Sequence, residues 1–221
     1  MKKIFLGPPG SGKGTYSQRI APLLGIPHIS TGDLFREHLK NETHIGKKVK
    51  VFLESGKLVP DDIVLEVVKI RISQEDCKKG FILDGFPRTI YQAEKLFEIT
   101  DIDIVTNLVI PEDILIEKIC SRRSCKECGF IYNLAEINRE GIHMPPMHPK
   151  IPGKCDKCQG KLIQRKDDCE EIIKERLEVY KKEIQPLIEF YKNKGILKDI
   201  KIIGSPEVMV EIILKELERF N

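Results

Sequence analysis

Short apolar runs alternate with longer amphipathic segments over most of the chain. Residues 104–110 are nearly all apolar, which is typical of a strand buried on both faces. Ile63, Val64, Val67 and Val68 recur at helical spacing, so they share one face of a helix. This alternation predicts a parallel sheet covered by helices.

The pattern predicts five strands and at least seven helices. The strands are expected at 2–6, 27–29, 81–83, 104–110 and 198–203. Helices are expected at about 12–24, from 30–33 onward, from 61 onward, at 89–97, 111–122 and 206–220, and from 168 with a kink or break at Pro186. The predicted fold class is therefore α/β, with three α/β/α layers around a five-stranded parallel sheet.

The alternation stops between 125 and about 164. This stretch carries paired cysteines, glycines and the proline-rich sequence MPPMHP at 144–149. Such a change in composition indicates a separate inserted lobe.

Residues 7–15 read GPPGSGKGT and follow directly on the first apolar run. Glycines let a backbone wrap closely around an anion, and the amides at the following helix start favour negative charge. Lys13 adds a positive charge and Thr15 a hydroxyl. The sequence therefore predicts a phosphate loop, with Gly10, Ser11, Gly12, Lys13, Gly14 and Thr15 against the phosphates.

Asp84 ends the third predicted strand, at the sheet edge where α/β proteins bind ligands. A carboxylate facing a phosphate loop suits Mg²⁺ held through its waters. Gly85 permits close backbone approach, and Arg88 is placed to reach a phosphate.

Cys125-x2-Cys128 and Cys155-x2-Cys158 have the spacing of two metal-binding knuckles. Four thiolates predict a closed structural site, with Zn²⁺ as the metal, in a lobe too small for its own core. Cys77, Cys120 and Cys169 are scattered and are expected to be packed thiols. His143 and His148 are expected to be solvated loop residues.

Composition narrows the function further. The 221 residues are 32% charged, but the net charge is only +3, which argues against duplex nucleic acid as a partner. The first residues lead straight into a strand, so neither a signal peptide nor a membrane span is expected. Paired cysteines without an export signal favour a metal and a cytoplasmic location.

Several segments together resemble one family. TGDLFR at 31–36, GKLVPDD at 56–62, FILDGFPRT at 81–89 with Gln92 beyond it, SRR at 121–123 and QRKDD at 164–168 appear in the order and spacing of adenylate kinases. With the phosphate loop and the cysteines, the chain resembles the zinc-bearing, long-lid bacterial type. The resemblance implies a monomer that transfers a phosphoryl group reversibly, from ATP with Mg²⁺ to AMP, giving two ADP.

The resemblance also implies roles for individual residues. Catalysis would fall to Lys13, Asp84, Arg88, Arg122, Arg165 and Arg176. Besides the phosphate loop, ATP would contact Arg122 and Ser205. The AMP-binding positions would be Thr31, Arg36, Gly56, Lys57, Val59, Gly85, Arg88, Gln92, Arg165 and Arg176, with Gln92 reading the adenine edge. Asp33 and Asp84 would organise Mg²⁺ through water.

The same resemblance implies a core and two mobile lobes. The core would comprise 1–29, 60–122 and 167–221, the lobe for the nucleoside monophosphate 30–59, and the zinc-ribbon-like lid 123–166. Four features depart from the family pattern. They are an extended lid segment at 138–152, Ser121 in place of a glycine, Lys118 where an arginine commonly stacks on the ATP adenine, and a short segment between Gln92 and Ile104.

Other readings stay open at this point. The nearest alternative keeps the enzyme class and takes UMP, CMP or GMP as the acceptor in place of AMP. A zinc-ribbon nucleic-acid binder using ATP only as a ligand is opposed by the balanced charge, and an inactive scaffold is opposed by the intact Lys13, Asp84, Arg88 and Arg165.

Overall fold

The computed structural model describes residues 1–55, 57–139 and 141–219. Its centre is the predicted five-stranded sheet, and every strand pair in it is parallel. The strand order is β10-β4-β1-β3-β2. The strands are β1 (Lys2–Leu6), β2 (His28–Ser30), β3 (Phe81–Asp84), β4 (Ile104–Val109) and β10 (Leu197–Lys201).

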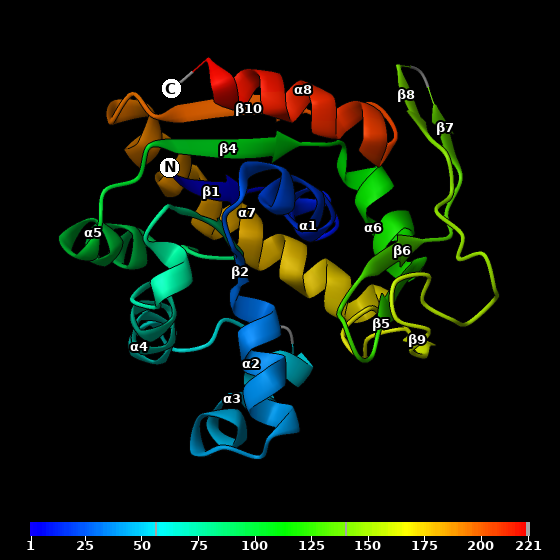
Figure 1. Cartoon of the computed structure of the whole chain (residues 1–221), viewed down its shortest axis with the longest axis horizontal. Helices are drawn as coiled ribbons and strands as arrows, with labels where there is room; N and C mark the ends of the chain where they lie inside the picture. The colour runs from blue at the N-terminus through cyan, green and yellow to red at the C-terminus, as the bar shows by residue number, and fades with distance from the viewer. Residues whose placement is uncertain (56, 140, 220–221) are drawn as a thin grey trace.

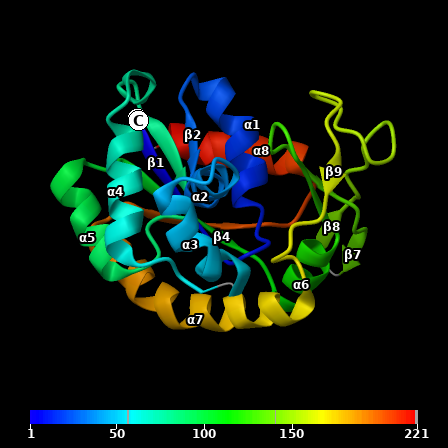
Figure 2. The same ribbon diagram turned by 90° about the horizontal axis from the view of Figure 1, so that it is seen from below.

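Helices cover both faces of this sheet, which confirms the predicted three layers. α1 and α8 lie on one side and α7 on the other (Figure 2). The helices are α1 (Lys13–Leu24), α2 (Thr31–Lys40), α3 (His44–Ser55), α4 (Asp61–Ile72), α5 (Ile90–Ile99), α6 (Glu112–Cys120), α7 (Glu170–Asn193) and α8 (Pro206–Glu218), with the short 3₁₀ helix η1 (Glu75–Cys77).

Local capping explains where several helices begin. The hydroxyl of Ser30 accepts a hydrogen bond from the amide of Asp33, and the hydroxyl of Thr89 accepts one from the amide of Gln92. Ser205 caps α8 in the same way through Val208. Each cap satisfies an amide that has no partner inside its helix.

Two apolar clusters hold the layers together, one on each face. Side chains of α1, α6, α8 and the first half of α7 form the first cluster, and side chains of α4, α5 and the second half of α7 form the other. Of the kink or break predicted at Pro186, the break is wrong, because α7 continues to Asn193. Leu187 and Tyr191 are buried just beyond the proline, and their packing offsets the missing backbone hydrogen bond.

Two peripheral units project from the sheet (Figure 1). One contains α2 and α3. The other lies between α6 and α7 and contains a three-stranded antiparallel sheet of β5 (Arg122–Cys125), β6 (Ile131–Asn133) and β9 (Leu162–Ile163), together with a hairpin of β7 (Ile137–Arg139) and β8 (Ile142–Met144). Within the described residues, no helix is long and apolar enough to cross a membrane.

The side chain of Lys3, on β1, is buried in the sheet. Lys3 is 0% exposed, and its Nζ has no hydrogen-bond partner among the described residues. Burial lowers its pKa from 10.5 to about 8, although the charge of Asp103 opposes the shift. The charged form is therefore less favourable in the folded protein than in the unfolded chain.

We expect Lys3→Met to raise the free energy of unfolding at pH 7 by ~1–2 kcal/mol, because it removes a buried charge. Between pH 8 and 10.5 the unfolded chain holds more protons at Lys3 than the folded protein does, so the free energy of unfolding of the wild type rises with pH. The difference in this free energy between Lys3→Met and wild type should therefore shrink. Denaturant melts of wild type, Lys3→Met and the exposed control Lys79→Met measure this. A difference in the free energy of unfolding between the two proteins that stayed constant from pH 7 to 10.5 would contradict the lowered pKa of Lys3.

Candidate functional site

The glycine-rich loop leads from β1 into α1 at the carboxyl edge of the sheet. Gly10 and Gly12 have positive φ angles of 84° and 97°, which glycine adopts without strain. A Cβ at Gly10 would lie 2.7 Å from a side-chain carbon of Ile119 in α6. The loop is thus tightly fitted against α6, and the first amides of α1 face the cavity above the sheet edge.

Lys13 and Asp84 lie at the floor of this cavity. Nζ of Lys13 donates to the carbonyls of Gly7 (2.6 Å) and Pro8 (2.9 Å), and burial lowers its pKa to about 7. A Cβ at Gly14 would lie 3.3 Å from Oδ2 of Asp84, so the carboxylate stands beside the loop.

Asp84 is held by His28 of the neighbouring strand β2. Nε2 of His28 lies 3.2 Å from Oδ2 of Asp84. Burial alone would raise the pKa of Asp84, but the His28 hydrogen bond and the charges of His28 and Lys13 outweigh it and lower that pKa. Asp84 is therefore an ionised acceptor, which suits a hydrated cation beside a phosphate.

Five arginines converge on the same cavity, which has a volume of about 210 Å³. They come from elements far apart in the sequence: α2, the turn after β3, β5, the segment after β9, and α7. The arginines are Arg36, Arg88, Arg122, Arg165 and Arg176, and all were expected at the site.

Carboxylates hold most of these arginines in place. Arg36 donates to Asp33 (2.5 Å), and Arg165 lies 3.7 Å from the same carboxylate. Arg176 donates to Asp167 (2.7 Å), and Arg122 donates through Nε to Asp168 (3.0 Å). Such pairing fixes the guanidinium groups before any ligand enters.

The cavity nevertheless carries more positive charge than its carboxylates offset. Burial lowers the pKa of Arg165 to about 9, assisted by the charges of Arg36 and Arg122. Burial likewise lowers the pKa of Arg176 to about 10, although Asp167 opposes the shift. The guanidinium of Arg88 donates only to the carbonyl of Gly85 (2.8 Å) among the described residues. A polyanion would relieve this repulsion, so the site suits polyphosphate.

A second, smaller cavity of about 50 Å³ adjoins the first, and Arg88 lines both. Its walls include Thr31, Lys57, Val59, Gly85 and Gln92, which the sequence had placed together. Gly56, expected here too, lies outside the described residues.

The amide of Gln92 has a fixed orientation. Its Oε1 accepts from the backbone amide of Arg88 (2.7 Å), and its Nε2 donates to Asp61 (2.7 Å), which also accepts from Thr89. A carboxylate only accepts, so the donor end of the amide must face Asp61. One lone pair of Oε1 and one hydrogen of Nε2 remain for a ligand. Because the contact with Asp61 fixes the amide, the side on which each of them lies is also fixed.

Ser205 differs from the other expected residues. Its hydroxyl caps α8, while its neighbours Gly204 and Pro206 line the main cavity. Sequence reasoning missed His28, Asp61, Asp167 and Asp168 as partners of site residues. The segments GKLVPDD and QRKDD contain the last three, but only the fold shows which side chain each carboxylate holds.

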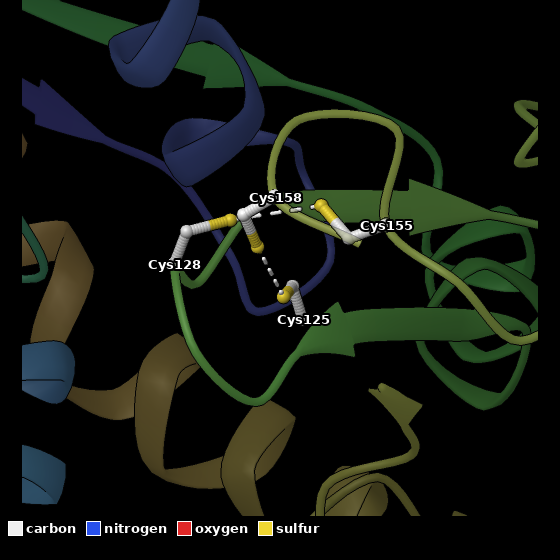
Figure 3. A group of neighbouring side chains, drawn as sticks. All are labelled: Cys125, Cys128, Cys155 and Cys158. Carbon is white, nitrogen blue, oxygen red and sulfur yellow. Dashed lines mark hydrogen bonds between the residues drawn. The ribbon is translucent and has the colours of Figure 1, made fainter. Parts of the chain in front are cut away.

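The four cysteines of the two CxxC pairs converge between β5 and the loop before β9 (Figure 3). Their sulfur atoms all lie within 4.8 Å of one another. Sγ of Cys125 is 3.4 Å from that of Cys158, and Sγ of Cys128 is 3.6 Å from that of Cys155, too far for disulfides. The spacing fits thiolates at about 2.3 Å around one tetrahedral ion, so the group can hold a metal.

Comparison with known proteins identifies the family. The sequence model described as adenylate kinase matches residues 5–196. An adenylate kinase of Archaeoglobus fulgidus is 48% identical over 223 residues, covering 99% of this chain and 96% of its own. One of Caldicellulosiruptor saccharolyticus is 48% identical over 213 residues, 94% of each chain, and one of Thermodesulfovibrio yellowstonii is 46% identical over 224 residues, 99% and 100% of the two chains.

We expect about one tightly bound metal ion per chain, removable only by strong chelators. Its removal should lower stability mainly around β5, β6 and β9, because this unit has few buried apolar residues of its own. Elemental analysis and hydrogen exchange before and after chelation measure this. Cys128→Ser should reproduce the effect, whereas Cys169→Ser should not. An unchanged melt and exchange pattern after verified metal loss would argue against a structural role.

Proposed function

The chain belongs to the adenylate kinase family, and from that premise we propose that it transfers the γ-phosphoryl group of ATP reversibly to AMP, giving two ADP. The observation that carries the proposal is the cluster of five arginines and Lys13 between a phosphate loop and a second cavity that contains Gln92. The main cavity takes the donor triphosphate, and the smaller one takes the acceptor.

The phosphate loop binds the donor phosphates. The amides of residues 10–15 face them at the amino end of α1, where the helix dipole favours negative charge. Lys13 exchanges its two carbonyl partners for phosphate oxygens, and Arg122 reaches them from the lid side.

Arg36 and Arg88 bind the acceptor phosphate. Both line the main cavity near its junction with the smaller one, and two parallel N–H groups of a guanidinium match two phosphate oxygens. Gln92 then presents its remaining acceptor and donor to N6 and N1 of adenine, with Thr31, Lys57, Val59 and the backbone of Gly85 completing the pocket.

The transfer itself needs alignment and positive charge more than covalent help. An oxygen of the acceptor phosphate attacks the γ-phosphorus of ATP. The bond between the γ-phosphorus and the oxygen that bridges the β- and γ-phosphates breaks, and ADP leaves. The attacking oxygen is already an anion, so no protein base is required. Arg165 and Arg176, which both line the main cavity, face the charge on the moving group.

Asp84 and Asp33 would hold Mg²⁺ through its waters, since both are ionised carboxylates that line the cavity. Mg²⁺ bound with the nucleotide supplies further neutralisation of phosphate charge. The four cysteines would hold Zn²⁺, whose closed four-thiolate site serves structure.

Residues 30–59 and 123–166 act as the two lobes that exclude water. Two ion pairs between these segments support this role: Lys166 lies 3.8 Å from Glu54, and Lys40 lies 3.9 Å from Glu127. Ile131 of the lid packs over the phosphate loop, where a Cβ on Gly14 would lie 3.1 Å from it. Exclusion of water prevents simple hydrolysis of ATP.

We also propose that the enzyme is a cytoplasmic monomer.

The first test is ADP formation from ATP and Mg²⁺ with AMP, CMP, UMP and GMP in parallel. We expect strong turnover with AMP alone, because the fixed amide of Gln92 offers its donor and acceptor in one order. Lys13→Ala, purified identically, should lose at least ~100-fold in kcat, which also reports any contaminating host enzyme. Turnover with another acceptor would overturn the role of Gln92, and none at all would overturn the function.

Arg88→Ala should raise KM for AMP about 10- to 100-fold, the loss expected for charge-assisted hydrogen bonds to phosphate. KM for ATP should change less than about twofold. Arg219→Ala, which removes an exposed arginine paired with Glu216 on α8, is the matched control. An effect confined to ATP would place Arg88 on the other nucleotide.

A further inference from the structure

The extended lid segment divides the lid into two parts. Ile137 of β7 lies opposite Met144 of β8, and both are buried in the apolar cluster of the core. In contrast, Cys125, Tyr132 and Leu162 belong to a separate small cluster around the four-cysteine group. By its packing, the β7–β8 hairpin belongs to the core, and the cysteine-bearing sheet forms a unit of its own.

Polar contacts fasten the hairpin to the core as well. Arg139 forms ion pairs with Asp113 and with Glu117 (2.9 Å to the latter), both on α6. The amide of His143 donates to the carbonyl of Ile203, just beyond β10 (2.9 Å). The hairpin lies beside α6 in both views (Figures 1 and 2).

The base of the hairpin forms one wall of the main cavity. Ile137, Met144 and Pro145 line it from the hairpin side, and Ile119, Gly204 and Pro206 line it from the core. This end of the cavity is mostly apolar, unlike the arginine-rich end beside Lys13. Lys118 also lines it, and its Nζ contacts the sulfur of Met144 (3.4 Å). Burial lowers the pKa of Lys118 to about 8. A flat, largely apolar ring with polar edges fits such a slot.

We propose that the β7–β8 hairpin is a fixed wall of the donor-base pocket. It stays on the core while the cysteine-bearing part of the lid opens and closes, and it sets how tightly and selectively the donor purine is held. The proposal rests on the proposed function, because it needs ATP in the main cavity. It confines the moving part of the lid to about 123–134 and 148–166.

Arg139→Ala tests the wall without touching the pocket, because Arg139 does not line the cavity. We expect KM for ATP to rise about three- to tenfold and the preference for ATP over GTP to fall, with kcat and KM for AMP within about twofold of wild type. Asp113→Ala combined with Glu117→Ala should have the same effect, and adding Arg139→Ala to that pair should change nothing more.

Arg71→Ala is the matched control, since Arg71 forms a similar two-bonded ion pair with Asp76 away from the cavity. Unchanged KM for ATP and unchanged donor preference in Arg139→Ala would overturn the proposal, and so would equal rises in KM for both substrates. Failure of the wild type to form ADP would instead overturn the proposed function, so the two failures are distinguishable.

Hydrogen exchange of the nucleotide-free protein gives a second test that does not depend on activity. Peptides covering 135–147 should exchange as slowly as those of β4 in the core sheet, and peptides covering 125–131 should exchange faster. Exchange of the hairpin together with the cysteine-bearing sheet, both faster than β4, would show that the whole lid moves as one and would overturn the proposal.

Discussion

Repulsion among like charges in a confined space is the constraint around which this molecule is organised. Five arginines and Lys13 line one cavity, and burial, assisted by the charges of neighbouring arginines, lowers the pKa of Lys13, Arg165 and Arg176. The folded chain tolerates this because Asp33, Asp167 and Asp168 hold individual guanidinium groups. The remaining imbalance is what a polyphosphate relieves, so the same charges that destabilise the free protein provide its affinity.

The rest of the architecture serves that arrangement. The carboxyl edge of the sheet supplies the phosphate loop and Asp84, the two peripheral units supply Arg36, Arg122 and Arg165, and α7 supplies Arg176. Because the arginines come from separate units, moving those units apart as proposed would disperse the positive charge. Bringing them together around an anion would restore it, and this would couple the chemistry to a change in shape.

Much of this was predictable from local sequence signals. The phosphate loop, the positions of the five strands, the helix starts near Ser30 and Thr89 and the two cysteine pairs each depend on short-range chemistry. The partners His28 and Asp61, the continuity of α7 through Pro186 and the docked hairpin depend on contacts between distant segments. Propensity and spacing do not encode such contacts, so only the folded structure gives them.

The ion pairs that join the two peripheral units have a consequence of their own. Lys166 with Glu54 and Lys40 with Glu127 are exposed pairs at 3.8 and 3.9 Å, so each contributes little and dissolved salt weakens it readily. If the lobes close over the nucleotides as proposed, these pairs would break easily once the phosphates leave. A higher ionic strength should then shorten the time for which the enzyme retains its products.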